Sequence, residues 1–228
     1  MKKISILIPV YNEKDSLLKI LEKIEEIDFF GLEKEFILID DCSTDGTKRL
    51  YKDLPYKILY HTKNKGKGAA LRTGLKEATG DIIIIQDADL EYNPSDYKEL
   101  VHLILTNQAD VVYGSRLADS NNSGNFLFLS FLANIVLTYL TRLLYQVYIT
   151  DMETCYKAFR ANIIKNITIE SNKFDFEPEI TAKILKQDIR FLDVPITYNA
   201  RTSTEGKKIT WKDGIQAIWT LIKYRFKN

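Results

Sequence analysis

The strongest structural signal in the chain is the stretch Asp81-Ile82-Ile83-Ile84-Ile85-Gln86-Asp87-Ala88-Asp89-Leu90-Glu91. Its isoleucines are typical of a strand that is buried on both faces of a sheet. Its last residues carry carboxylates at alternate positions, and alternate residues of an extended chain face the same way. The sequence therefore predicts a buried strand that brings Asp87, Asp89 and Glu91 together where the sheet ends.

Similar apolar runs lie on both sides of this stretch. Further strands are predicted at residues 4–10, 36–39, 57–60 and 110–113, and helices at residues 16–27, 46–52, 67–78 and 95–107. This alternation is typical of an α/β domain with a mainly parallel, Rossmann-like sheet between helices. Ligands of such sheets bind beyond the carboxyl ends of the strands, which is where the polar clusters of this sequence fall.

The composition excludes several classes of protein. The 228 residues are 45% hydrophobic, enough for one sizeable core, so the chain is neither disordered nor fibrous. Its 32 basic and 31 acidic residues leave a net charge of +1, which argues against nucleic acid as a partner.

The two cysteines and the N-terminus bear on the cellular compartment. Cys42 and Cys155 are too few for a disulfide framework and indicate reduced thiols in the cytoplasm. A single disulfide between them is the alternative. The apolar run that ends at Pro9 has no signal-peptide cleavage site.

The second half contains two candidate membrane-surface helices. Residues 126–148 are strongly apolar, with Arg142 as the only charge, but the uncharged part is shorter than the roughly 20 residues that cross a bilayer. A span there would also separate Asp151 from the Asp87 cluster. Residues 210–227 have the aromatic and basic pattern of an amphipathic helix on an anionic membrane, and the alternative is a core helix with a solvated basic face.

Converging carboxylates repel one another unless a cation lies between them. Oxygen ligands suit Mg²⁺ or Mn²⁺ shared with substrate phosphates, so Asp87, Asp89 and Glu91 are candidate metal ligands. The alternative is a solvated acidic turn before Asn93-Pro94.

Two other loops are suited to a nucleotide. Asp40 and Asp41 end the second strand, where a carboxylate can accept a hydrogen bond from a base while Tyr11 stacks on its ring. Residues 64–70 form a glycine-rich basic loop that opens a helix, so its N–H groups and lysines could face phosphate, although P-loop spacing is missing. Helix capping in residues 43–45 and an ordinary surface turn are the alternative explanations.

Taken together, these motifs resemble a known family. IPVYNE, IDDCSTDGT, NKGKGAAL, GDIIIIQDADLEYNP and VVYGSR, in this order, resemble glycosyltransferase family 2 of the GT-A fold. TDMETCYKAFR, FDFEPEIT, VPITYNART and EGKKITWKDG are similar to the dolichyl- or polyprenyl-phosphate sugar synthase branch. The resemblance implies one GT-A domain over residues 1–228. Residues 1–118 would be the nucleotide-sugar-binding half, and 119–228 the acceptor half with interfacial helices at about 126–148 and 210–227.

The resemblance also implies roles for single residues, some of which the loops above already favour. The nucleotide-sugar-binding residues are Pro9, Tyr11, Glu13, Asp40, Asp41, Lys67, Gly68, Asp87, Ala88 and Asp89. The metal ligands are Asp87, Asp89 and Glu91, and the catalytic residues are Asp89, Arg116, Arg201 and Lys207. Arg116 matches an acceptor-phosphate arginine, and Arg201 and Lys207 match a loop that closes over the phosphates. Glu91 stands where mannosyl-type relatives commonly carry Gln, so the resemblance does not determine which sugar the donor carries.

The implied reaction is inverting transfer of a hexose from a UDP- or GDP-linked sugar to a polyprenyl or dolichyl phosphate, with Mg²⁺ or Mn²⁺. The alternative acceptor is a sugar hydroxyl in cell-surface polysaccharide synthesis, which needs a carboxylate to take its proton. Candidates for this base are Asp151, Glu153, Asp175 and Glu177.

Two further alternatives are a non-catalytic nucleotide-sugar-binding protein and a nucleotidyltransferase. The expected location is the cytoplasmic face of a membrane. The protein would bind there peripherally, with a separate membrane protein or a second copy as further possible partners.

Overall fold

The computed structural model describes residues 1–118, 128–199 and 211–227. Within these ranges the chain forms a seven-stranded sheet in the order β3-β2-β1-β4-β6-β5-β7. The strands are β1 (Lys3–Val10), β2 (Glu33–Asp40), β3 (Lys57–Tyr60), β4 (Ile82–Ile85), β5 (Val111–Ser115), β6 (Lys157–Arg160) and β7 (Phe191–Pro195). Strand β6 runs antiparallel to β4 and β5, and the other pairs are parallel, so the predicted mainly parallel sheet is confirmed.

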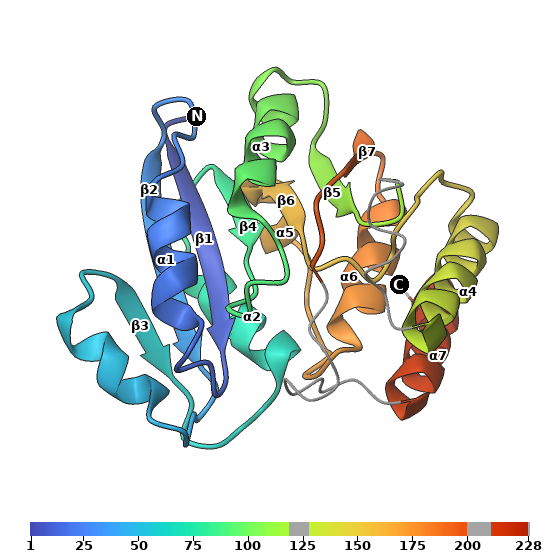
Figure 1. Cartoon of the computed structure of the whole chain (residues 1–228). Coiled ribbons are helices and arrows are strands. Elements are labelled where there is room, and N and C mark those ends of the chain that lie inside the picture. The colour runs from blue at the N-terminus through green and yellow to red at the C-terminus, as the bar shows by residue number, and fades with distance from the viewer. Residues whose placement is uncertain (119–127, 200–210, 228) are drawn as a thin grey trace.

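Helices cover both faces of the sheet (Figure 1). One face carries α1 (Leu17–Glu25) and α3 (Tyr97–Leu105), and the other carries α2 (Lys67–Glu77) and α6 (Phe176–Leu185). Helices α4 (Phe128–Tyr145) and α7 (Trp211–Phe226) pack side by side next to α6. Short helices are η1 (Thr47–Asp53), η2 (Pro94–Asp96) and α5 (Ala161–Lys165). None of the helices in the described ranges is long and apolar enough to cross a bilayer.

Strand β4 explains why the central sequence is apolar throughout. Ile82 and Ile84 belong to the core under α1 and α3, whereas Ile83 and Ile85 belong to the core under α2 and α6. Successive strand residues point to opposite faces, so a strand between two helical layers needs apolar side chains at every position. Each buried isoleucine contributes about 1.5–3 kcal/mol, which makes this strand the anchor of both cores.

Some parts of the fold differ from the sequence-based expectation, which includes no strand at residues 157–160 or 191–195. Residues 47–53 form a 3₁₀ helix rather than an ordinary α-helix. Strand β6 is not predicted by an apolar run, because it begins with Lys157 and ends with Arg160. Both charges are compensated by carboxylates from other elements, Lys157 by Glu177 and Arg160 by Asp110.

Candidate functional site

The chain turns where β4 ends. The residues after Gln86 leave the sheet, Ala88 and Asp89 form a turn, and Leu90 has a positive φ of 65°. Side chains of a turn do not alternate as those of a strand do. The backbone after Gln86 is therefore not extended as expected, and the convergence of Asp87, Asp89 and Glu91 stays a prediction.

Each of these carboxylates has its own contacts. Asp87 pairs with Lys67 at 2.9 Å, and Asp89 accepts a hydrogen bond from the backbone N–H of Glu91 at 3.2 Å. The Glu91 side chain accepts a hydrogen bond from the hydroxyl of Tyr198 at 3.0 Å. Across the described part of the chain, no three His, Cys, Asp or Glu residues are placed to hold a metal ion. Asp87, Asp89 and Glu91 thus stay predicted metal ligands, and in this structure Asp87 and Glu91 have protein partners.

Asp87 and Asp89 nevertheless suit a smaller role toward Mg²⁺ or Mn²⁺. Magnesium is usually bound by one or two carboxylates together with substrate phosphates and water, rather than by a complete protein cage. Both side chains are partly exposed at the carboxyl edge of the sheet. This donor set fits a metal that is shared with a diphosphate, and it does not fit a metal held by the protein alone.

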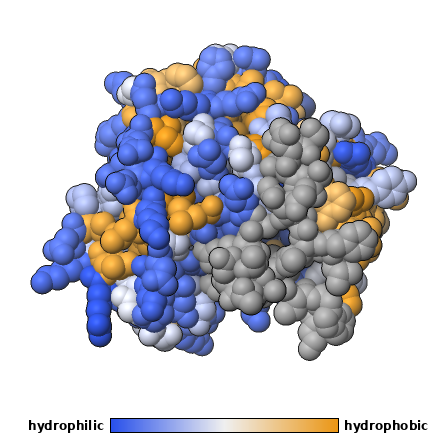
Figure 2. Space-filling view, viewed as in Figure 1, coloured by the Kyte–Doolittle hydropathy of each residue, from blue (hydrophilic) through white to orange (hydrophobic). Residues whose placement is uncertain are grey.

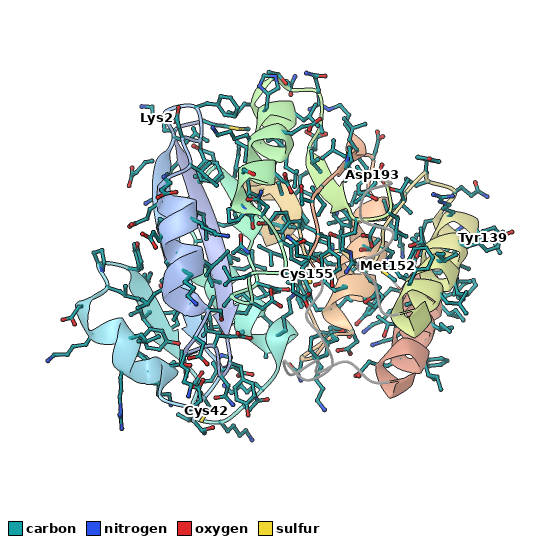
Figure 3. The ribbon with its side chains drawn as sticks, viewed as in Figure 1. Lys2, Cys42, Tyr139, Met152, Cys155 and Asp193 are labelled. Carbon is teal, nitrogen blue, oxygen red and sulfur yellow. The ribbon has the colours of Figure 1, made fainter. Side chains whose placement is uncertain are left out.

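A cluster of paired charges surrounds Asp87. Lys67, the first residue of α2, has its ammonium 2.9 Å from Asp87, 3.1 Å from Glu177 and 3.0 Å from the sulfur of Cys155. Glu177 also pairs with Lys157, which is fully buried. Burial opposes charge on Asp87, but the Lys67 ammonium outweighs it and holds the pKa of Asp87 below its ordinary value. Figure 3 shows Cys155 in the middle of the molecule, among side chains from several elements.

The glycine-rich loop before α2 is held in place by Asp41. The Asp41 carboxylate accepts hydrogen bonds from the backbone N–H groups of Lys65 at 2.8 Å and Gly66 at 2.6 Å. Gly66 has a positive φ of 96°, and a β-carbon there would lie 2.4 Å from a backbone oxygen of residues 171–172. A β-carbon at Gly68 would lie 2.6 Å from another. Both glycines therefore allow the loop to approach this segment closely, which positions Lys67.

Asp40 is fully buried at the end of β2. One carboxylate oxygen accepts a hydrogen bond from the backbone N–H of Ser43 at 2.9 Å, and the other accepts one from the hydroxyl of Tyr51 at 2.7 Å. Both oxygens thus stabilise the turn that leads into η1. In this arrangement a nucleotide base cannot reach Asp40 unless the turn opens.

The loop after β1 lies against the same turn. Asn12 has a positive φ of 58°, and the backbone N–H of Glu13 donates to the hydroxyl of Thr47 at 3.0 Å. Pro9 and Tyr11 are partly exposed at the carboxyl edge. The loop is therefore fixed by its backbone, and Tyr11 is accessible to a planar ring.

Arg116 and Asp151 form a buried ion pair after β5. Two guanidinium nitrogens of Arg116 donate to the two carboxylate oxygens at 2.7 and 2.9 Å. Asn134 on α4 donates to the same carboxylate at 2.7 Å, and the guanidinium lies 5.2 Å from the ring centre of Tyr198. Burial opposes charge on Asp151, but Arg116 keeps its pKa below the ordinary value. Asp151 is therefore a poor proton acceptor.

The other candidates for a general base differ in their surroundings. Glu177 is paired with two lysines, and Asp175 begins α6 and accepts a hydrogen bond from the backbone of Lys173. Oε1 of Glu153 is buried and has no hydrogen-bond partner among the described residues. Burial, together with the neighbouring Glu177, raises the pKa of Glu153 to about 7. Glu153 is thus suited to exchange a proton near neutral pH.

The sequence does not predict every residue that contacts the site, and two of the residues that it does predict are not among the described residues. Lys157, Asn134 and Tyr198 contact the predicted carboxylates, but only the fold brings them near. Only Lys157 had a signal in the sequence, because it is a lysine within a short apolar run. The predicted residues Arg201 and Lys207 lie outside the described residues.

Comparisons with known proteins identify the family of this chain. The family model described as glycosyl transferase family 2 matches residues 5–168. A dolichol-phosphate mannosyltransferase of Pyrococcus furiosus is 29% identical over 211 residues, which cover 90% of this chain but 59% of that protein. A UDP-N-acetylglucosamine–dolichyl-phosphate N-acetylglucosaminyltransferase of Methanococcus voltae is 26% identical over 217 residues, which cover 86% of this chain and 85% of that one.

A solved structure shares the fold. Glucosyl-3-phosphoglycerate synthase from Mycobacterium tuberculosis, in complex with Mn²⁺, UDP and phosphoglyceric acid, superposes with a TM-score of 0.78 at 18% identity. The match covers 99% of this chain and 79% of that one, which agrees with the predicted GT-A architecture. Because the family model matches well over half of the chain, the protein belongs to glycosyl transferase family 2.

Proposed function

We propose that this protein transfers a hexose from a nucleotide-sugar to a polyprenyl phosphate at a membrane surface, with inversion at the anomeric carbon. The observation that carries the proposal is the position of α4, whose outer face is apolar and whose inner face contacts the Arg116–Asp151 pair. The relatives named above transfer different sugars to dolichyl phosphate, so the sugar is left open.

The outer faces of α4 and α7 expose large apolar side chains. Tyr139 is 67% exposed and Leu143 65%, while Trp219 is 60% and Phe226 80% exposed. Among the described side chains, this set recurs at helical spacing and comprises Leu132, Ile135, Val136, Tyr139 and Leu143 on α4, and Ile215, Trp219, Ile222 and Phe226 on α7. Figure 2 shows hydrophobic surface on the side where α4 lies, and Figure 3 shows Tyr139 directed away from the sheet. Apolar stripes beside basic residues such as Arg225 are typical of helices that lie on a membrane.

A membrane on this face would bring a lipid phosphate close to Arg116. Asn134, on the inner side of α4, contacts the Asp151 carboxylate that Arg116 binds. The lipid and Arg116 are thus separated by about one helix diameter, roughly 10 Å. A lipid phosphate at this surface would approach the guanidinium of Arg116, a group that is suited to phosphate oxygens.

The chemistry follows from the charges of the site. An anionic oxygen of the lipid phosphate attacks the anomeric carbon while the bond from that carbon to the nucleoside diphosphate breaks, and no proton has to be removed. Asp87 and Asp89 would hold the divalent cation, which offsets the charge that develops on the departing diphosphate. Arg201 and Lys207 would add positive charge beside the diphosphate, because the resemblance implies that their loop closes over the phosphates.

Glu153 favours a second candidate function. A sugar hydroxyl is a weak nucleophile and needs a base, and a carboxyl with a pKa of about 7 is suited to that task. Transfer to a hydroxyl would then rise with pH through about 7 and depend on Glu153. Transfer to a lipid phosphate needs no ionised carboxylate, and a charged Glu153 near that phosphate would repel it.

The two candidates are separated by a transfer assay. UDP- and GDP-linked hexoses are first screened by thermal shift with Mn²⁺, and the best donor is then offered undecaprenyl or dolichyl phosphate in vesicles. The proposal expects a glycosyl lipid phosphate of inverted configuration, and a Glu153→Gln variant that keeps transferring. The proposal would be overturned if the protein transferred the sugar to sugar hydroxyls alone, and if Glu153→Gln abolished this transfer while still binding the donor.

A further inference from the structure

Lys67 lies between two carboxylates from distant parts of the chain. Its ammonium is 2.9 Å from one oxygen of Asp87 and 3.0 Å from the other, and it is 3.1 Å from Oε1 of Glu177. The side chain is only 10% exposed. Oε1 of Glu177 has no well-directed hydrogen bond from any described residue, although the ammonium is close. Glu177 is therefore placed to receive an N–H of Lys67 that now points elsewhere.

Lys67 competes with a divalent cation for the oxygens of Asp87. Mg²⁺ approaches its ligand oxygens to about 2.0–2.1 Å, whereas the ammonium now occupies the space in front of both Asp87 oxygens. Two cations this close together repel strongly in a site that is largely closed to water. Metal binding at Asp87 is therefore favoured when the ammonium moves away from at least one of its oxygens.

Glu177 gives the displaced ammonium a place to stay. Its other oxygen is held by the buried Lys157, so the Glu177 side chain is fixed and its Oε1 remains close to Lys67. A small rotation of the Lys67 side chain is enough to exchange one carboxylate for the other. The ammonium then remains beside the metal ligands, where it can donate to a diphosphate oxygen.

We infer that Lys67 exchanges between Asp87 and Glu177, and thereby makes metal binding depend on the nucleoside diphosphate. This inference rests on the proposed function only in taking Asp87 as a metal ligand. Before the donor binds, Lys67 neutralises Asp87. When metal and diphosphate bind together, Lys67 pairs with Glu177 and contacts the diphosphate. Lys67 is the residue that contacts the ligand, and Glu177 is a positioning residue.

Charge balance gives the reason for this dependence. In the cluster, the ammonium groups of Lys67 and Lys157 already offset the carboxylates of Asp87 and Glu177. A divalent cation alone would leave an excess of positive charge in a poorly solvated site, which is unfavourable. A divalent cation that arrives with the doubly negative diphosphate of a nucleotide-sugar adds no net charge. Metal and nucleotide should therefore bind together far better than metal alone.

The test is the affinity of the protein for Mn²⁺, measured with and without UDP or GDP. The free Mn²⁺ is detected by electron paramagnetic resonance. In the wild-type protein, the nucleotide should raise the Mn²⁺ affinity at least about tenfold. In Lys67→Met, Mn²⁺ alone should bind about tenfold more tightly than in the wild type, because the competing cation is gone. The nucleotide should then raise the affinity much less.

Two control variants isolate the exchange. Lys63→Met removes an exposed positive charge just before this loop, and it should leave both Mn²⁺ affinities unchanged. Lys67→Arg keeps the charge and should restore the nucleotide dependence in part. Thermal unfolding of each variant shows whether it is folded.

Several outcomes would overturn the inference. One is a folded Lys67→Met that binds Mn²⁺ alone no better than the wild type. Another is a wild-type protein whose Mn²⁺ affinity does not respond to a nucleotide that it binds, a result that needs no variant. A wild-type protein that binds neither UDP nor GDP with Mn²⁺ would instead contradict the proposed function.

Discussion

Replacing Glu153 by glutamine should stabilise the protein above neutral pH. One oxygen of this carboxyl is buried without a hydrogen-bond partner among the described residues, and burial raises its pKa to about 7 from an ordinary value of 4.5. Between these pH values, the folded protein holds a proton that the unfolded chain has released. The unfolding free energy of the wild type therefore falls as the pH rises from about 4.5 to 7.

The size of the effect follows from the two pKa values. Each pKa unit corresponds to about 1.4 kcal/mol, so a difference of about 2.5 between the folded and unfolded pKa corresponds to about 3.4 kcal/mol. The Glu153 side chain is partly exposed, and solvent screening reduces this figure. We expect Glu153→Gln to be about 2 kcal/mol more stable than the wild type above pH 7, and equally stable near pH 4.5.

Urea unfolding, followed by tryptophan fluorescence at pH 5, 6, 7 and 8, measures this difference. Glu35→Gln is a control of opposite sign: although burial opposes charge on Glu35, hydrogen bonds from Ser5 and Thr79 lower its pKa to about 2. That carboxylate stabilises the fold above pH 4.5, and the contribution is lost as the pH falls toward 2. A Glu153→Gln variant whose stability differs from the wild type by the same amount at every pH, or that is less stable at pH 8, would refute the reasoning.

Three further variants test other parts of the structure. Gly66→Ala would place a β-carbon 2.4 Å from the backbone oxygen of Asn172 at a positive φ, so we expect a loss of at least about 1 kcal/mol in urea unfolding and weaker UDP or GDP binding by calorimetry. Tyr51→Phe leaves a buried oxygen of Asp40 without its hydroxyl donor and should cost about 1–3 kcal/mol in the same unfolding assay. Trp219→Ser should reduce co-sedimentation with anionic vesicles several-fold and leave the unfolding midpoint unchanged, because its side chain is 60% exposed; a lower midpoint would show that Trp219 supports the fold instead.

The hydrophobic pattern was sufficient to predict β1 to β5, but not β7, which is parallel to β5. Strands such as β1 and β4 are apolar on both faces because helices cover both, and this leaves a direct trace in the sequence. Strand β6 leaves no such trace. It is short, and its charged residues Lys157 and Arg160 are neutralised by carboxylates that lie elsewhere in the sequence.

The carboxyl edge of the sheet could be predicted as the location of the site, but not the orientation of its side chains. Asp87 and Asp89 lie at that edge as expected, because parallel strands end there together. Before Glu91 the backbone turns at Leu90 instead of staying extended, and the Tyr198 hydroxyl donates to the Glu91 side chain. Positive φ at a leucine is unusual and has no signal in the sequence.

Pairing also determines which charges of the site are available to a ligand. Motifs indicate that Lys67 and Arg116 face phosphates, and the structure shows that each already has a carboxylate, Asp87 and Asp151 respectively. A cation with a buried partner attracts a distant anion weakly, because the pair is nearly neutral. Lys67 can exchange its partner, since Glu177 is close, whereas Arg116 is held by two hydrogen bonds to one carboxylate. On the proposed function, Lys67 therefore supplies charge to the donor diphosphate, and Arg116 orients the acceptor phosphate without adding net charge.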